Sequence, residues 1–122
     1  MDKLILVFLG GGLGSVLRYG IGSLMPTTSN GSWPWSTWIS NVVASAILGF
    51  LAGLIILRPG QFERERLLLG VGFCGGLSTF STFTLEGFEL IRNGQIAVAV
   101  AYMVISTLSC LLACWAAWSL QR

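Results

Sequence analysis

The 122-residue sequence has no histidine and few charged residues. Lysine, arginine, aspartate and glutamate make up 10% of the chain, against about a quarter in an ordinary soluble domain. Without histidine or a Cys-x-x-Cys motif, no transition-metal site with the usual ligand spacing is visible. The net charge of +2 is too small to indicate a nucleic-acid partner. We therefore expect no nucleic-acid binding and no enzymatic activity.

Apolar residues dominate what remains: 54% of the chain is hydrophobic and the mean hydropathy is +0.79. At about 20 residues per span, this length accommodates four membrane helices and almost nothing else. We expect spans at about 4–25, 37–57, 67–91 and 95–120, forming a single transmembrane domain over residues 1–122. The N-terminus has no clear cleavage site for a signal peptide. The expected location is the bacterial plasma (inner) membrane, as a multi-pass protein.

The third apolar segment contains the unusual stretch GGLSTFSTF at residues 75–83. Glycine is a weak helix former, and serine and threonine compete for backbone hydrogen bonds. Lipid cannot satisfy freed backbone groups, so a broken helix is tolerated only in protein or beside a wet cavity. Such breaks commonly mark ion or substrate sites. The sequence predicts an all-α membrane protein whose third helix is broken at its centre.

Small or polar residues recur at four-residue spacing along the other three spans. The sets are Gly10 with Gly14 and Gly11 with Ser15; Asn41, Ser45, Gly49 and Gly53; and Tyr102, Ser106, Cys110 and Cys114. Residues four apart share a helix face. Each face is expected to pack closely against another helix or to line a narrow passage.

Several polar or aromatic residues within the spans permit two interpretations. Arg18 is an interfacial anchor or a charge that attracts anions into a vestibule. Asn41 makes an interhelical hydrogen bond or donates to a passing anion. Phe80 and Phe83 share a helix face and either pack conventionally or present positive ring edges to an anion. Glu86 is a vestibule charge or an ordinary interfacial residue.

The stretch at 75–83 resembles the signature of the Fluc/CrcB family of bacterial fluoride channels. Further similarities are GSVLRY at residues 14–19, WPWST at 33–37 leading to Asn41, and Glu86 placed three residues after Phe83. The resemblance covers essentially the whole chain. Of its parts, the nine-residue signature is specific, whereas the faces of small residues are not.

This resemblance implies an antiparallel, dual-topology homodimer with four helices per subunit and two fluoride pores at the subunit interface. It also implies a structural sodium ion on the dimer axis. The implied residues are Phe80, Phe83, Asn41, Ser106 and Tyr102 in the pore, Ser81, Thr82 and Glu86 along a polar track, Arg18 near an entrance, and the backbone carbonyls of Gly75 and Ser78 as sodium ligands. The implied activity is export of cytoplasmic fluoride by passive electrodiffusion, which provides fluoride resistance.

Alternatives remain open at this point. Five basic residues fall on the N-terminal side of the expected spans and one or two on the other, so an oppositely oriented paralogue is an alternative to the homodimer. A proton-coupled fluoride exchanger is a second alternative. A small dual-topology multidrug or cation antiporter would need a carboxylate in the first span, which holds Arg18 instead. A non-transporting assembly factor would leave the hydroxyl-rich break unexplained.

Overall fold

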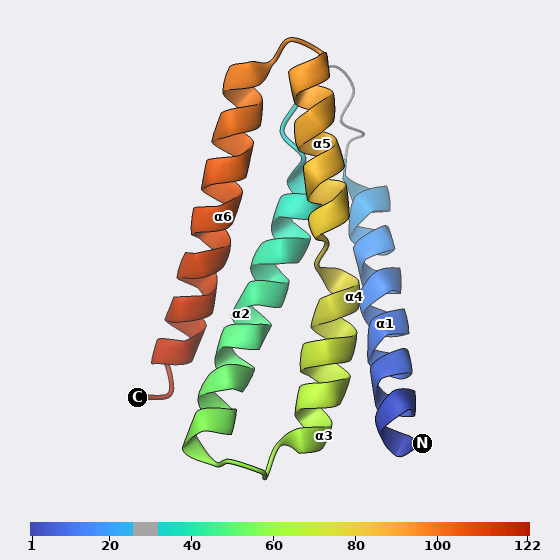
Figure 1. Ribbon diagram of the computed structural model, residues 1–122, viewed down its shortest axis with the longest axis vertical. Helices are drawn as coiled ribbons and strands as arrows, with labels where there is room; N and C mark the ends of the chain where they lie inside the picture. The colour runs from blue at the N-terminus through green and yellow to red at the C-terminus, as the bar shows by residue number, and fades with distance from the viewer. Residues whose placement is uncertain (26–31) are drawn as a thin grey trace.

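The computed structural model describes residues 1–25 and 32–122, and these are helical apart from short connections (Figure 1). The elements are α1 (Asp2–Leu24), α2 (Trp35–Leu57), α3 (Glu63–Glu65), the π-helix η1 (Arg66–Cys74), α4 (Gly75–Leu77), α5 (Phe80–Arg92) and α6 (Ile96–Ser119). In the described part, four helices are long and apolar enough to cross a membrane. They are Asp2–Leu24, Trp35–Leu57, Glu63–Arg92 and Ile96–Ser119, and they overlap the four expected ranges.

The four spans run up and down, so that both chain termini lie at one end of the molecule (Figure 1). The α2–α3 connection lies at the same end, where Lys3 forms a 2.6 Å ion pair with Glu63. At the other end, Gly94 adopts a positive φ of 78° in the turn between α5 and α6. Along their lengths, α1 packs mainly on η1 and α4, and α2 packs mainly on α6.

Glycines bring α1 into backbone contact with the third span. A Cβ atom at Gly10 would meet the Leu68 carbonyl oxygen, and one at Gly14 would meet the Leu77 amide nitrogen at 2.8 Å. From the opposite side, a Cβ at Gly76 would meet the Ser15 amide nitrogen at 2.9 Å. Only glycine permits this approach, which confirms the predicted close packing along this face of α1.

The face of small residues on α2 has two different uses. Gly49 lies against the backbone of Cys114 on α6, where a Cβ atom would approach the Cys114 Cα at 2.8 Å. Gly53 lies against the side chain of Gln121, just beyond the end of α6. Ser45 and Asn41, one and two turns nearer the start of α2 than Gly49, instead line an open groove. Close packing thus fixes one end of the α2–α6 pair, and a cavity occupies its middle.

The third span is broken, as the sequence predicts, and the break lies at Ser78 and Thr79. Ser78 has φ −82° and ψ 156°, and Thr79 has φ −153° and ψ 125°, so both are extended. Gly75 and Gly76 precede the break and are helical. The glycines therefore do not interrupt the helix themselves. Gly76 instead allows the backbone of α1 to approach closely. The two hydroxyl residues provide the interruption.

Candidate ion pathway at the broken third span

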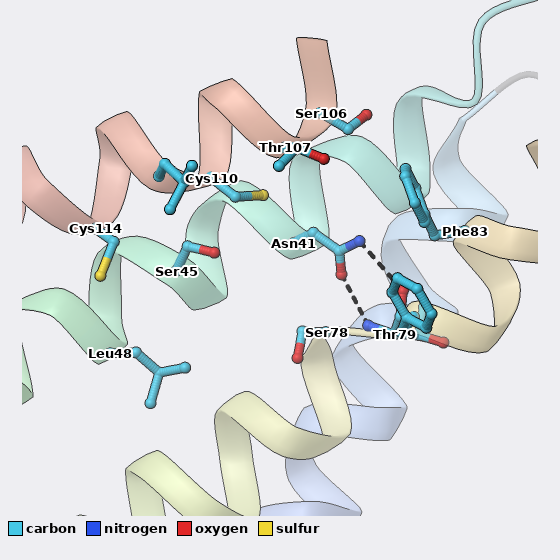
Figure 2. Close-up of a pocket in the computed structure, with 12 residues that line it drawn as sticks. Asn41, Ser45, Leu48, Ser78, Thr79, Phe83, Ser106, Thr107, Cys110 and Cys114 are labelled. Carbon is cyan, nitrogen blue, oxygen red and sulfur yellow. Dashed lines mark hydrogen bonds between the residues drawn. The ribbon is translucent and has the colours of Figure 1, made fainter. Parts of the chain in front are cut away.

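Asn41 of α2 pairs with both backbone groups of Thr79. The Thr79 amide donates to Asn41 Oδ1 at 2.8 Å, and Asn41 Nδ2 donates to the Thr79 carbonyl oxygen at 3.2 Å (Figure 2). The amide would otherwise be unpaired at membrane depth, which costs several kcal/mol, whereas the carbonyl, at the N-cap of α5, also accepts the first helical bond. The interhelical interpretation of Asn41 is therefore confirmed. An amide carries two N–H donors, and only one is used in this pair.

Side chains divert the amides that would continue the helix through the break. In an unbroken helix, the Thr79 amide would donate to Gly75 and the Thr82 amide to Ser78. Here the Thr79 amide donates to Asn41, and the Thr82 amide donates to Thr79 Oγ1 at 3.2 Å, which caps the start of α5. The carbonyls of Gly75 and Ser78 thus lose their helical donors.

Two other carbonyls near the end of α4 receive side-chain donors. Arg18 Nε donates to the Gly76 carbonyl oxygen at 3.0 Å, and Ser78 Oγ donates to the Cys74 carbonyl oxygen at 2.7 Å. A helix C-terminus carries partial negative charge, so a guanidinium there is favourable. Arg18 thus binds the backbone directly beside the break, which neither sequence-based interpretation included.

An open groove of about 470 Å³ lies on one side of the break, between α2 and α6 (Figure 2). It is lined by Asn41, Ser45, Leu48, Ser78, Thr79, Phe80, Phe83, Ser106, Thr107, Cys110, Leu111 and Cys114. Most of this lining is apolar, with polar atoms at a few points. Among them, the Oγ of Ser106 is buried and finds no hydrogen-bond partner in residues 1–25 and 32–122.

Aromatic rings extend from this groove into the protein. The centroids of Phe80 and Phe83 are 5.8 Å apart, and Phe83 lies 5.1 Å from the ring of Tyr102. Tyr102 is fully buried, whereas Phe80 is 79% exposed. The two phenylalanines therefore share a face of α5, as their spacing predicts, and Phe80 stands out from the surface of the single chain.

A second cavity, of about 500 Å³, lies on the other side of the break among α1, α2 and α5. Most of the residues that line it are polar: Ser15, Arg18, Tyr19, Gly22, Ser23, Ser36, Thr37, Thr79, Thr82 and Glu86. We call it the polar cavity. Thr79 lines both this cavity and the groove. The break therefore lies between a cavity that contains Arg18 and a more apolar groove that contains the phenylalanines.

The carboxylate of Glu86 is held from both sides. Thr37 Oγ1 donates to Oε1 and the Tyr102 hydroxyl donates to Oε2, each at 2.7 Å. Because Tyr102 also contacts Phe83, Glu86 connects the polar cavity to the aromatic side of the groove. Glu86 is thus built into the protein at a cavity wall, unlike a carboxylate that merely faces the headgroups.

The predicted site residues fall into two groups around Thr79. Asn41, Ser78, Phe80, Phe83 and Ser106 line the groove; Arg18, Thr82 and Glu86 line the second cavity. Tyr102 joins them. Like Tyr102, two further residues line neither cavity: Ser81, whose hydroxyl lies 3.3 Å from Thr79 Oγ1, and Gly75, which is exposed.

The sequence predicted no role in the site for Thr79 or Thr37, although both bind other site residues. Thr79 caps α5 and pairs with Asn41, and Thr37 binds Glu86. A threonine directly before an apolar helix is a recognised capping signal and would have identified Thr79. The role of Thr37 had no such signal, because it depends on a contact between residues 49 positions apart.

Comparison with known proteins identifies the family. Residues 5–118 match the family described as "CrcB-like protein, Camphor Resistance (CrcB)". The chain belongs to the CrcB family. It is 45% identical over 104 residues to the fluoride-specific ion channel FluC of Methylobacterium sp. (strain 4-46), covering 85% of this chain and 83% of the relative.

Two further relatives cover the whole of this CrcB-family chain. The proteins named fluoride-specific ion channel FluC from Rhizobium meliloti (strain 1021) and Pyrococcus furiosus (strain ATCC 43587) are 39% and 40% identical over 122 residues. Each alignment spans 98% of the relative. The resemblance noted in the sequence is confirmed. Membership of this family agrees with a multi-pass membrane protein that is an ion channel and not an enzyme.

Proposed function

We propose that this CrcB-family protein is a fluoride-selective channel that exports cytoplasmic fluoride by passive electrodiffusion. The observation that carries the proposal is the pair of cavities meeting at Thr79. An anion attracted into the polar cavity by Arg18 would pass the break and enter the groove beside Phe80 and Phe83. The names of the relatives, fluoride-specific ion channels, support fluoride as the anion.

Selection in this proposal depends on partial dehydration in a narrow passage. The second N–H of Asn41 and the unpartnered hydroxyl of Ser106 replace some of the water around fluoride. The positive edges of Phe80 and Phe83 contact the ion weakly, and their bulk excludes larger hydrated anions. Ser81 and Thr82, with Tyr102 and Glu86, extend this lining toward the polar cavity, where Arg18 raises the local anion concentration.

We also propose that a structural sodium ion binds the backbone carbonyls of Gly75 and Ser78. Carbonyl oxygens are hard ligands that can replace the water around a small cation. The fit is supported by the diverted amides at the break, since these two carbonyls lack their helical donors. Gly75 is exposed, and a Cβ there would meet nothing within 4 Å in the described residues. When bound, the ion would offset the negative ends of the broken helices.

Residues 1–122 are proposed to form one transmembrane domain that pairs with a second, inverted copy. The single chain leaves the break, the groove and the 79%-exposed Phe80 open on one side. Backbone of this kind is not tolerated against lipid, so another protein surface must cover it. An antiparallel homodimer is the arrangement that the family resemblance implies, and it would bring two copies of Gly75 and Ser78 to a shared sodium ion.

Fluoride efflux from liposomes tests the proposal. The purified protein is reconstituted with internal potassium fluoride, and release is followed with a fluoride electrode while chloride is measured in parallel. Electrodiffusion predicts fast fluoride loss only after valinomycin releases the voltage, with chloride retained. Fluoride loss that ignores valinomycin and moves protons would support the proton-coupled exchanger instead. No fluoride loss from a correctly folded dimer would contradict the proposal.

A further inference from the structure

Two of the three cysteines lie on the wall of the groove. Cys110 and Cys114 of α6 both line it and are partly exposed, whereas Cys74 is completely buried in the helix core. Figure 2 places the two side chains in the space between α6 and α2, on successive turns. No disulfide joins them; all three cysteines are free thiols. The groove therefore presents two accessible thiols to which the proposed conduction mechanism assigns no role.

The spacing of these thiols suits a shared ligand. Side chains four residues apart on a helix have Cβ atoms about 5–6 Å apart on one face. Metal–sulfur bonds of about 2.3 Å, as zinc makes with cysteine, would span that separation when one ion lies between both sulfurs. Thiolates prefer soft metal ions, and a soft ion can be bound by two ligands alone.

The surroundings of the thiols favour a divalent ion. The surface of the groove wall is mainly apolar, and the described charged side chains do not line it. A divalent ion bound by two thiolates is neutral, so it avoids the cost of leaving a net charge in a low-dielectric site. One turn from Cys110, the Ser106 side chain is 3% exposed, and its Oγ lacks a hydrogen-bond partner within the described ranges. This hydroxyl is two turns from Cys114 on α6, so an ion held between both sulfurs is bound by the two thiolates alone.

We propose that Cys110 and Cys114 form a binding site for a soft divalent metal ion, and that its occupation blocks the groove. Binding releases two protons: two thiols and one Hg²⁺ give one bis-thiolate complex and two H⁺. The metal would lie opposite Ser45 on α2, in the same groove as Asn41 and Phe83. Binding itself depends only on the thiols, whereas block of fluoride rests on the proposed channel function.

Mercuric ion is the probe for binding. The purified dimer in detergent is titrated with Hg²⁺ in the presence of glutathione, and the mercury–thiolate absorbance is recorded. Because two linked thiols bind one ion with a high effective concentration, the chelate is expected to survive the competing monothiol. The expected result is one retained ion per chain for the wild type and for Cys74→Ala. Cys110→Ser and Cys114→Ser should each lose it.

A second measurement uses the wild-type protein, so its result does not depend on whether the variants fold. Alkylation with N-ethylmaleimide, followed by mass mapping, should label Cys110 and Cys114 and spare buried Cys74. Bound Hg²⁺ should protect the two labelled sites. Metal retention by the Cys110→Ser/Cys114→Ser double variant, its loss in Cys74→Ala, or alkylation of both groove thiols despite bound metal would each overturn the site.

Fluoride efflux then tests the block. Hg²⁺ should reduce wild-type efflux to the level of empty liposomes, and a dithiol should restore it. Efflux by the double variant, compared with its own rate before the metal is added, should not change with Hg²⁺. Wild-type efflux that continues with the metal bound would overturn the blocking role. If the protein binds Hg²⁺ at the two thiols but passes no fluoride before its addition, the metal site stands and the proposed channel function fails.

Discussion

The side-chain amide of Asn41 binds both backbone groups of Thr79: it accepts from the Thr79 N–H at 2.8 Å, which replaces the helical bond lost at the break, and it donates to the Thr79 carbonyl oxygen at 3.2 Å. One side chain on α2 therefore holds the extended backbone at membrane depth. The same pairing withdraws the Thr79 amide from the Gly75 carbonyl. Asn41 therefore has two effects. It binds backbone that lipid could not satisfy, and it leaves the Gly75 carbonyl oxygen available to the proposed sodium ion.

Asn41→Ala is expected to destabilise the protein by roughly 1–3 kcal/mol, because the amide of Thr79 is left unpaired and its carbonyl loses one of two donors. Asn41→Asp should also be harmful, since it places an oxygen against the Thr79 carbonyl oxygen. Thermal unfolding of the detergent-solubilised dimer measures the effect. Val43→Ala, at an exposed position on the same helix, is the matched control. Equal stability of Asn41→Ala and the control would contradict the role of the pair.

Gly14 and Gly12 provide a comparison within one helix. A Cβ at Gly14 would contact the Leu77 amide at 2.8 Å, whereas a Cβ at Gly12 would meet no described atom within 4 Å. Gly14→Ala is expected to cost roughly 1–3 kcal/mol through overpacking against the third span. Gly12→Ala should be neutral or slightly stabilising, because alanine is the better helix former. If both changes unfold the protein equally in a thermal melt, the close contact with α4 is wrong.

Arg18 should influence fluoride flux through its charge and through its bond to Gly76. Arg18→Gln removes the charge, and its reduced flux relative to wild type should be most evident at low ionic strength, where electrostatic attraction is least screened. Arg18→Lys keeps the charge and should retain more flux under the same conditions. Arg92→Gln, at the last residue of α5, is the control. Identical salt dependence of Arg18→Gln and Arg92→Gln would exclude the vestibule role.

The four spans and the broken third helix are predictable from this sequence because the bilayer restricts the choices. A long apolar segment must be helical in lipid, and a hydroxyl-rich stretch within one marks an interruption. The sequence did not predict which of residues 75–83 form the break. Glycine suggests a break by propensity, yet Gly76 is held in a helix by the close approach of Ser15 on α1. Tertiary packing here outweighs local preference.

The candidate site was predictable as a set of residues, but its internal bonds were not. Spacing placed Phe80 and Phe83 on one face, and their rings are neighbours. Nothing in the local pattern indicated that the Tyr102 hydroxyl would bind Glu86, or that Arg18 would donate to Gly76. These contacts depend on how separate helices pack, and a single sequence does not specify that geometry.

The proposed fluoride conduction depends most directly on the two phenylalanines of the groove. Phe80→Ile and Phe83→Ile keep apolar bulk but remove the positive ring edges. Phe88→Ile is the matched control, because Phe88 lies on α5, is exposed and lines neither cavity. Valinomycin-triggered fluoride efflux from liposomes should fall strongly in both groove variants and remain at the wild-type rate in Phe88→Ile. Wild-type efflux in both groove variants would contradict conduction past these rings.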